Sequence, residues 1–150
     1  MLECIVVGMG GFLGAVLRYL IGLIPLHAES GFPVKTFFIN IVGAFVIGIV
    51  AAFAARNAWN PKVVLFLKVG LCGGFTTFSS FALETDQLLA KGQTVTAALY
   101  VIFSILFGVF AVFAAQSVVS CLAKYKFQYF CFYIIANQFT HMDQQIRSSW

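Results

Sequence analysis

The sequence predicts an all-α integral membrane protein with four transmembrane helices. Of its 150 residues, 61% are hydrophobic and only 9% are charged, whereas soluble domains carry about 25% charged residues. Four apolar segments are each about 20 residues long or slightly more, the length that spans roughly 30 Å of hydrocarbon. No basic cluster interleaved with exposed aromatic residues is present, so we expect membrane lipid rather than nucleic acid as the surroundings.

The four spans are expected near residues 4–24, 34–55, 62–90 and 94–122. Their connections are short and contain Pro25, Pro33 and Pro61, so neighbouring helices are expected to run antiparallel. We therefore divide the chain into a four-helix domain, 1–123, and a C-terminal extension, 124–150. The apolar run in the extension is about 10–14 residues long, too short to span a bilayer. We expect it to be interfacial, disordered or an extension of the fourth helix.

In the first span, Gly10, Gly14 and Arg18 recur every four residues and share one helix face. Such a face is typical of close helix packing, with the arginine reaching toward the interface. Alternatively, Arg18 caps polar backbone or attracts anions to a vestibule.

The second span contains one strongly polar side chain, Asn40. An unpartnered amide in hydrocarbon is costly, so Asn40 is expected to face the protein interior or water. Its NH₂ group suits either an interhelical hydrogen bond or donation to an anion.

The third span is expected to be broken near residues 73–77, because glycines and threonines there are poor helix formers. Broken helix at membrane depth is tolerated only beside protein or a water-filled cavity, and it frees backbone groups that can hold ions. Phe78 and Phe81 share one helix face after the break and are either core side chains or part of an ion site. Glu84 is expected to have a structural role, such as a cap or salt bridge at the vestibule.

The fourth span has Tyr100, Ser104 and Gly108 at four-residue steps. By itself this stripe indicates a packing face, with the Ser104 hydroxyl bonded back to its own helix. Beside Asn40 and the third-span hydroxyls, it would complete a line of donors across the membrane.

These patterns together resemble the CrcB/Fluc family of fluoride channels. The matching motifs, one in each span, are Gly10-Gly11-x-x-Gly14-Ala15-x-x-Arg18-Tyr19, Thr36-Phe37-x-x-Asn40-x-x-Gly43-x-Phe45-x-x-Gly48, Gly73-Gly74-Phe75-Thr76-Thr77-Phe78-Ser79-Ser80-Phe81 with Glu84, and Tyr100-x-x-x-Ser104-x-x-x-Gly108. Each motif is weak alone, but the four in order are specific, and the resemblance covers about residues 1–123.

The resemblance implies a dual-topology homodimer of antiparallel subunits, with two fluoride pores along the dimer interface. It assigns the pore to Asn40, Phe78, Ser79, Ser80, Phe81, Tyr100 and Ser104. It also implies a structural sodium ion at the dimer centre, held by the backbone carbonyls of Gly73 and Thr76. Arg18 would match the family's first-helix arginine near the vestibule. The implied location is the bacterial inner (plasma) membrane, where the channel would passively export cytoplasmic fluoride and so reduce its toxicity.

The distribution of cations agrees with a chain that inserts both ways. Arg56 and Lys62 lie on one side of the membrane, and Lys35 and Lys91 on the other, so the four spans carry no clear orientation signal. The extension disturbs this balance, because its cations Lys124, Lys126 and Arg147 all add to the side of the N-terminus.

Two other functions were weighed. A small dimeric efflux transporter coupled to protons needs a protonatable carboxylate at mid-membrane, whereas Glu3, Glu29, Glu84 and Asp86 are expected near span ends. A non-transporting scaffold subunit would leave the intramembrane polar groups unexplained. No pairing of a nucleophile with a base and no metal-ligand spacing is present, so we expect no enzymatic activity.

Overall fold

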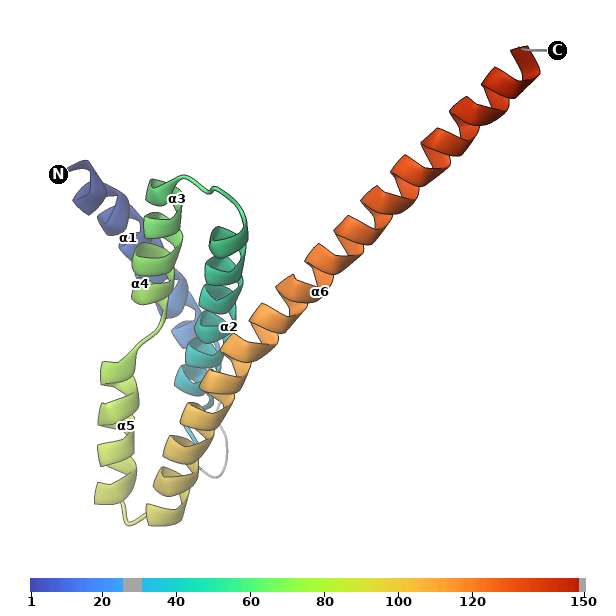
Figure 1. The fold of residues 1–150 in the computed structure, drawn as a ribbon. Coiled ribbons are helices and arrows are strands. Elements are labelled where there is room, and N and C mark those ends of the chain that lie inside the picture. Colours follow the sequence, from blue (N-terminus) through green and yellow to red (C-terminus); the bar gives the residue numbers. More distant parts are fainter. Residues whose placement is uncertain (26–30, 149–150) are drawn as a thin grey trace. The chain divides into compact units, whose positions relative to one another are not determined.

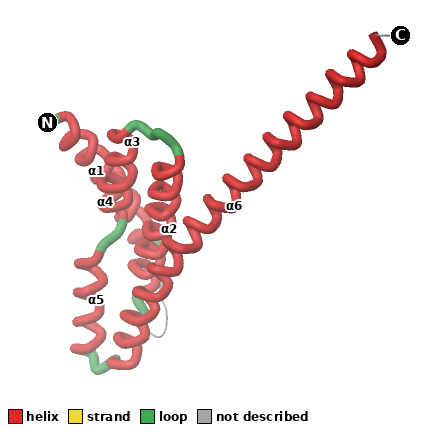
Figure 2. The backbone as a smooth tube through the Cα atoms, in the orientation of Figure 1, coloured by secondary structure: helices red, strands yellow, loops and turns green. Residues whose placement is uncertain are grey.

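The computed structural model describes the backbone of residues 1–25 and 31–148, and the side chains of residues 1–25 and 31–125. All regular structure in these ranges is helical (Figures 1 and 2). The chain forms two compact units, Met1–Gln116 and Ser117–Trp150. The first unit contains every residue that the sequence assigned to a functional site.

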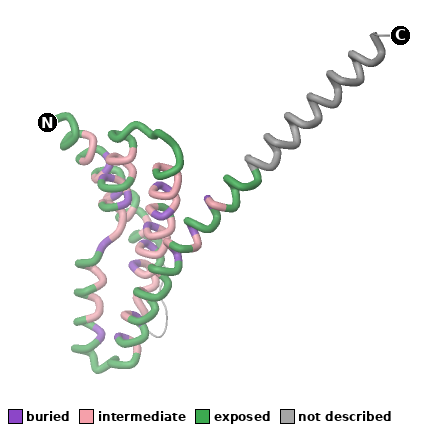
Figure 3. The backbone as a smooth tube through the Cα atoms, viewed as in Figure 1, coloured by how far each residue is buried: buried purple, intermediate pink, exposed green. Residues whose placement is uncertain are grey.

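Four helical stretches are long and apolar enough to cross a membrane: Leu2–Leu23, Val34–Arg56, Pro61–Ala90 and Thr94–Tyr125. These agree with the predicted spans, so the prediction of four transmembrane-capable helices is confirmed. Many large apolar side chains are exposed, including Phe12 and Phe110 at 69% and 67%, and the outward faces of the helices are largely exposed in Figure 3. Such surfaces suit contact with lipid.

The end of the first helix and the start of the second follow from the local sequence. Helix α1 (Leu2–Leu23) stops at Ile24, which is extended because it precedes Pro25. Helix α2 (Val34–Arg56) begins after Pro33. The ammonium group of Lys35 donates to the carbonyl of Gly22 at 2.8 Å, which satisfies one of the carbonyls left free at the end of α1.

The third span consists of several pieces. Helix α3 (Pro61–Leu65) is capped by the Asn60 side chain and leads into the π-helix η1 (Phe66–Cys72). A short α4 (Gly73–Phe75) follows, and after two extended residues the chain resumes as α5 (Phe78–Ala90). Figure 2 shows the interruption as a loop between α4 and α5.

The break lies at Thr76 and Thr77, within the predicted range, and of the two residue types held responsible only the threonines interrupt the helix. Gly73 and Gly74 are helical, whereas Thr76 and Thr77 have ψ values of 157° and 109°. β-Branched residues favour extended backbone, and the Thr77 side chain caps α5 by accepting from the Ser80 N–H at 3.2 Å.

The glycines instead allow α1 to lie against the third span. A Cβ atom on Gly70 would lie 2.9 Å from the Gly10 Cα, and one on Gly74 would lie 2.9 Å from the Gly11 Cα. No side chain fits between backbones this close, so the small-residue face predicted for the first span is a packing groove.

The first part of helix α6 (Thr94–Ser148) packs against α2 and α5. Tyr100 is fully buried and belongs to a core cluster with Leu88 and Ala97. Phe37 and Phe107 pack edge to face, with ring centroids 6.1 Å apart. This core holds α2, α5 and α6 together beside the break.

Helix α6 is 55 residues long and continues through the C-terminal extension to Ser148. The backbone of the extension up to Ser148 is therefore a continuation of the fourth helix. The side chains of residues 126–150, on which an interfacial location depends, lie outside the described residues.

Candidate functional site

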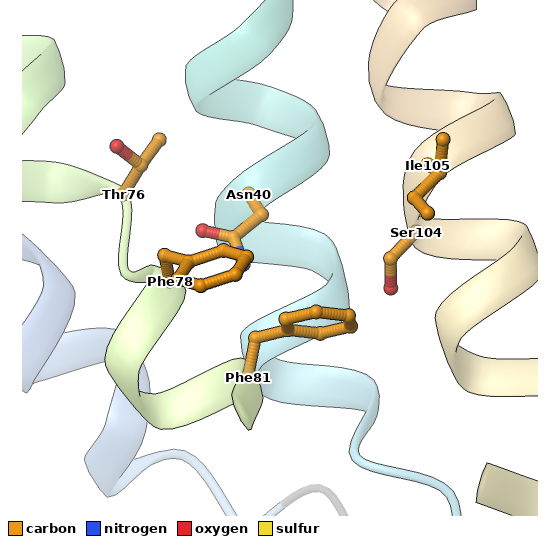
Figure 4. Close-up of a pocket in the computed structure, with 6 residues that line it drawn as sticks. All are labelled: Asn40, Thr76, Phe78, Phe81, Ser104 and Ile105. Carbon is orange, nitrogen blue, oxygen red and sulfur yellow. The ribbon is translucent and has the colours of Figure 1, made fainter. Parts of the chain in front are cut away.

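A pocket of about 260 Å³ lies beside the break in the third span. Three helices and the break supply its lining residues, which are Asn40, Thr76, Phe78, Phe81, Ser104 and Ile105. Figure 4 shows Asn40 and the two phenylalanine rings on one side, with Ser104 and Ile105 across from them. No lining residue is ionisable, so the polar groups that face this space are amide, hydroxyl and backbone groups.

The Asn40 side chain is bonded to the backbone of the break. Its Oδ1 atom accepts from the Thr77 N–H at 2.8 Å, and its Nδ2 atom donates to the Thr77 carbonyl at 3.1 Å. Of the two alternatives for Asn40, the interhelical hydrogen bond is therefore present. The NH₂ group has two hydrogens, so one N–H remains beyond the bond to Thr77.

The hydroxyls of the third span form a cluster at the start of α5. Thr77 is 8% exposed, and its Oγ1 atom lies 2.9 Å from the Ser80 Oγ and 3.3 Å from the Ser79 Oγ. Ser79 is exposed and Ser80 is half-buried. The structure thus brings Ser79 and Ser80 together at the break, next to the pocket but not among its lining residues.

Phe78 and Phe81 form the aromatic wall of the pocket. Their ring centroids are 5.6 Å apart, and the Phe81 ring also packs against Tyr100 at 5.1 Å. Phe78 is 80% exposed, whereas Phe81 is half-buried. An aromatic ring has a positive edge, so this wall can offer ring edges to an anion.

The hydrogen bond predicted for the Ser104 hydroxyl differs from what the structure shows. Its hydroxyl was expected to bond back to its own helix, but the Ser104 Oγ is buried and has no hydrogen-bond partner among the described residues. An unpaired buried hydroxyl costs free energy. Ser104 lines the pocket, and its hydroxyl has no bond to another described residue that a polar species in the pocket would have to replace.

Glu84 joins α2, α5 and α6. Its two carboxyl oxygens accept from the Thr36 hydroxyl at 2.6 Å and from the Tyr100 hydroxyl at 2.8 Å. A cap or a salt bridge was predicted for Glu84. Among the described residues its carboxyl group instead accepts from these two hydroxyls. The Tyr100 hydroxyl is therefore turned to Glu84, and Tyr100 is not a lining residue of the pocket.

Thr36 has a role in the structure that was not predicted, since it stood only as one residue of the second-span motif. Thr36 is 6% exposed and lies one helical turn before Asn40, so both side chains point to the same face of α2. That four-residue spacing was the available signal. The partner, Glu84, is 48 residues away in sequence, and this pairing follows only from the tertiary structure.

Arg18 caps polar backbone, which was one of the alternatives for it. Its Nε atom donates to the Gly74 carbonyl at 3.2 Å, and the side chain is half-buried. Arg18 does not line the pocket.

Gly73 is the first residue of α4, and Thr76 is the first residue of the break. Gly73 is exposed, and a Cβ atom there would meet nothing within 4 Å. In a continued α-helix the Gly73 carbonyl would accept from the Thr77 N–H, but that N–H donates to Asn40. Carbonyl oxygens suit hard cations, so the Gly73 carbonyl freed in this way is a group that could hold one.

The sequence was compared with known protein families and proteins. Residues 5–116 match the model of the family described as CrcB-like protein, Camphor Resistance (CrcB).

A protein of Gloeothece citriformis named fluoride-specific ion channel FluC is 42% identical over 114 residues, which cover 75% of this chain and 93% of that protein. A Rhizobium meliloti protein of the same name is 41% identical over 120 residues, or 79% of this chain and 96% of that protein. A Chlorobium luteolum protein, again of that name, is 43% identical over 113 residues, or 75% of this chain and 88% of that protein. The matched region contains the break, the pocket and their supporting side chains, and we conclude that the chain belongs to the CrcB-like family.

Proposed function

We propose that this chain is a passive, selective fluoride channel that exports fluoride down its electrochemical gradient. The observation that carries the proposal is the pocket beside the break, which combines an asparagine amide, two phenylalanine rings and a serine hydroxyl that has no hydrogen-bond partner among the described residues. The relatives named fluoride-specific ion channel at about 40% identity support it.

The chemistry of the pocket suits a small, strongly hydrated anion. A pore must replace the water around fluoride with compact donors, and the remaining Asn40 N–H and the Ser104 hydroxyl are such groups. The edges of Phe78 and Phe81 add weak positive potential. No lysine or arginine lines the pocket, which favours passage, because an ion site must bind weakly enough to release the ion.

The role of the remaining hydroxyls is part of the proposal. Ser79 and Ser80 would lie along the approach to the pocket, and Ser104 with Tyr100 along α6 on the other side. Because the Tyr100 hydroxyl is bonded to Glu84, it would contribute to the pathway through this network or after exchanging its partner.

We further propose that two copies associate antiparallel to complete the pathway. The 80% exposure of Phe78 leaves this wall of the pocket without a covering element in a single chain. The near balance of cations between the two sides of the four spans is compatible with insertion in both orientations.

A structural sodium ion at the centre of this homodimer is a related proposal. The Gly73 and Thr76 carbonyls would hold it, since the break removes the helical N–H partner of the first of these. A bound cation would neutralise freed backbone dipoles and add positive potential near the anion path. Efflux measured with sodium and with a large organic cation in its place would test this role.

Four spans make the chain a multi-pass membrane protein, and we place it in the bacterial inner (plasma) membrane. There, a negative-inside potential favours anion exit by about 2.3 kcal/mol per 100 mV. No coupled energy source is needed for export.

The test is fluoride efflux from liposomes that contain the purified 150-residue chain, measured with a fluoride electrode after valinomycin is added across a potassium gradient. Chloride-loaded liposomes are the control. We expect rapid fluoride release with chloride retained. If fluoride is retained, the assay is repeated with a chain that ends at Ala123. Fluoride release by this shorter chain would show that the extension inhibits the channel. Retention of fluoride by the shorter chain as well would refute the channel function.

A further inference from the structure

The two-residue break is held by side chains from two other helices. On the α5 side, both amide atoms of Asn40 bond the backbone of Thr77. On the α4 side, the Arg18 Nε bonds the Gly74 carbonyl. Asn40 also lines the pocket, whereas Arg18 does not, so Arg18 acts on the break alone.

The Gly74 carbonyl needs a donor because the helix stops. In a continuous α-helix it would accept from the Phe78 N–H. Thr76 and Thr77 are extended instead, and Phe78 is the first residue of the next helix, α5. The Phe78 N–H is therefore not placed to donate to the Gly74 carbonyl. A carbonyl left unpaired at membrane depth is costly, and the Arg18 N–H removes that cost.

The approach of α1 makes this bond possible. Gly14 lies one helical turn before Arg18, and a Cβ atom on Gly14 would lie 2.7 Å from the Phe75 nitrogen. With no side chain at Gly14, the two backbones touch. The Arg18 side chain is thereby brought within reach of the last turn of α4.

We propose that Arg18 is a positioning residue for the ion pathway, and that it acts through the N–H group at Nε rather than through its positive charge. The bond holds the carbonyl end of α4, which fixes where Thr76 and Phe78 enter the pocket. This proposal rests on the proposed channel function for its flux readout, but the bond itself can be tested without ion flow.

Two substitutions separate the N–H donor from the charge. In Arg18→Gln the side-chain nitrogen lies the same number of bonds from Cα as the arginine Nε, so a neutral N–H donor stands at the same place. In Arg18→Lys the charge stays, but a methylene group occupies that place. Arg18→Met removes both the donor and the charge. Lys68→Gln is the matched control, because it removes an exposed cation from the third span.

The variants are measured in the liposome efflux assay and by thermal unfolding in detergent. We expect Arg18→Gln and Lys68→Gln to stay near the parent rate, and Arg18→Lys and Arg18→Met to lose about tenfold in efflux rate. The same order is expected for the unfolding temperature. An Arg18→Lys variant with the parent rate, or an Arg18→Gln variant as slow as Arg18→Met, would overturn the proposal. If the parent chain does not conduct, the channel function fails, while the order of unfolding temperatures still tests the bond.

Discussion

Replacing Gly14 by alanine tests whether close contact between α1 and the third span sets the geometry of the break. The added Cβ would press most closely on the Leu71 carbonyl oxygen, and it would also lie 2.7 Å from the Phe75 nitrogen and 3.0 Å from the Gly74 carbonyl carbon, whereas ordinary contacts begin at 3.4 Å. The backbones must therefore separate by about 0.7 Å to relieve the contact with the Phe75 nitrogen, and by more to relieve the contact with the Leu71 carbonyl oxygen. The same movement would stretch the 3.2 Å bond from Arg18 to Gly74 beyond hydrogen-bonding distance.

The energetic cost is set by two opposing terms. Overpacking a well-packed contact costs about 1–3 kcal/mol, and alanine in a helix gains up to about 1 kcal/mol over glycine. Gly8→Ala in the same helix is the control, since a Cβ there meets nothing within 4 Å. Both variants share the helix-propensity gain, so the difference between their stabilities measures the contact.

Both variants are compared by thermal unfolding in detergent and by fluoride efflux from liposomes. We expect Gly14→Ala to unfold at a temperature several degrees below Gly8→Ala and to conduct more slowly. Equal stability and equal flux in the two variants would refute the account of glycine packing. It would also weaken the case that the position of α4 depends on α1.

Three further substitutions address the pocket and its support. Asn40→Asp replaces the bond donor to the Thr77 carbonyl with a carboxylate oxygen and puts negative charge in the pocket, so fluoride efflux should be abolished; unchanged efflux would remove Asn40 from the pathway. Phe81→Ile keeps an apolar side chain but removes the ring edge, so efflux should slow, and the parent rate would count against an aromatic contact with the anion. Tyr100→Phe leaves Glu84 with one hydroxyl donor fewer and should destabilise the fold by about 1–3 kcal/mol, measured by thermal unfolding.

Exposed residues of the same types provide controls. Asn57→Asp changes an exposed asparagine after α2, and Tyr19→Phe removes a hydroxyl from a side chain that is 66% exposed. Neither residue lines the pocket, so neither change should alter flux; Asn57→Asp also loses an exposed hydrogen bond to the Phe53 carbonyl at 3.0 Å, so it is a control for flux, and Tyr19→Phe is the control for stability. A stability loss in Tyr19→Phe equal to that in Tyr100→Phe would contradict the importance of the bond to Glu84.

The membrane architecture of this chain could be predicted from local features of the amino-acid sequence. Hydrophobic length and short connections are local properties, and they predicted the four spans because a bilayer imposes one length on every crossing helix. The break in the third span was also predictable, because local propensities oppose helix there. Of the residues that the motifs assign to the pore, Asn40, Phe78, Phe81 and Ser104 line the pocket, whereas Ser79, Ser80 and Tyr100 do not.

The pairing of the polar groups could not be predicted, because it depends on how the helices pack. The partners of Arg18, Asn40 and Glu84 are 56, 37 and 48 residues away in sequence, and helical periodicity gives a face but not its partner. Glycines and threonines together predicted the break, but only the threonines lie in it, whereas Gly70 and Gly74 are helical and permit the contact with α1. A glycine weakens a helix and also permits close approach, and packing decides which property is used.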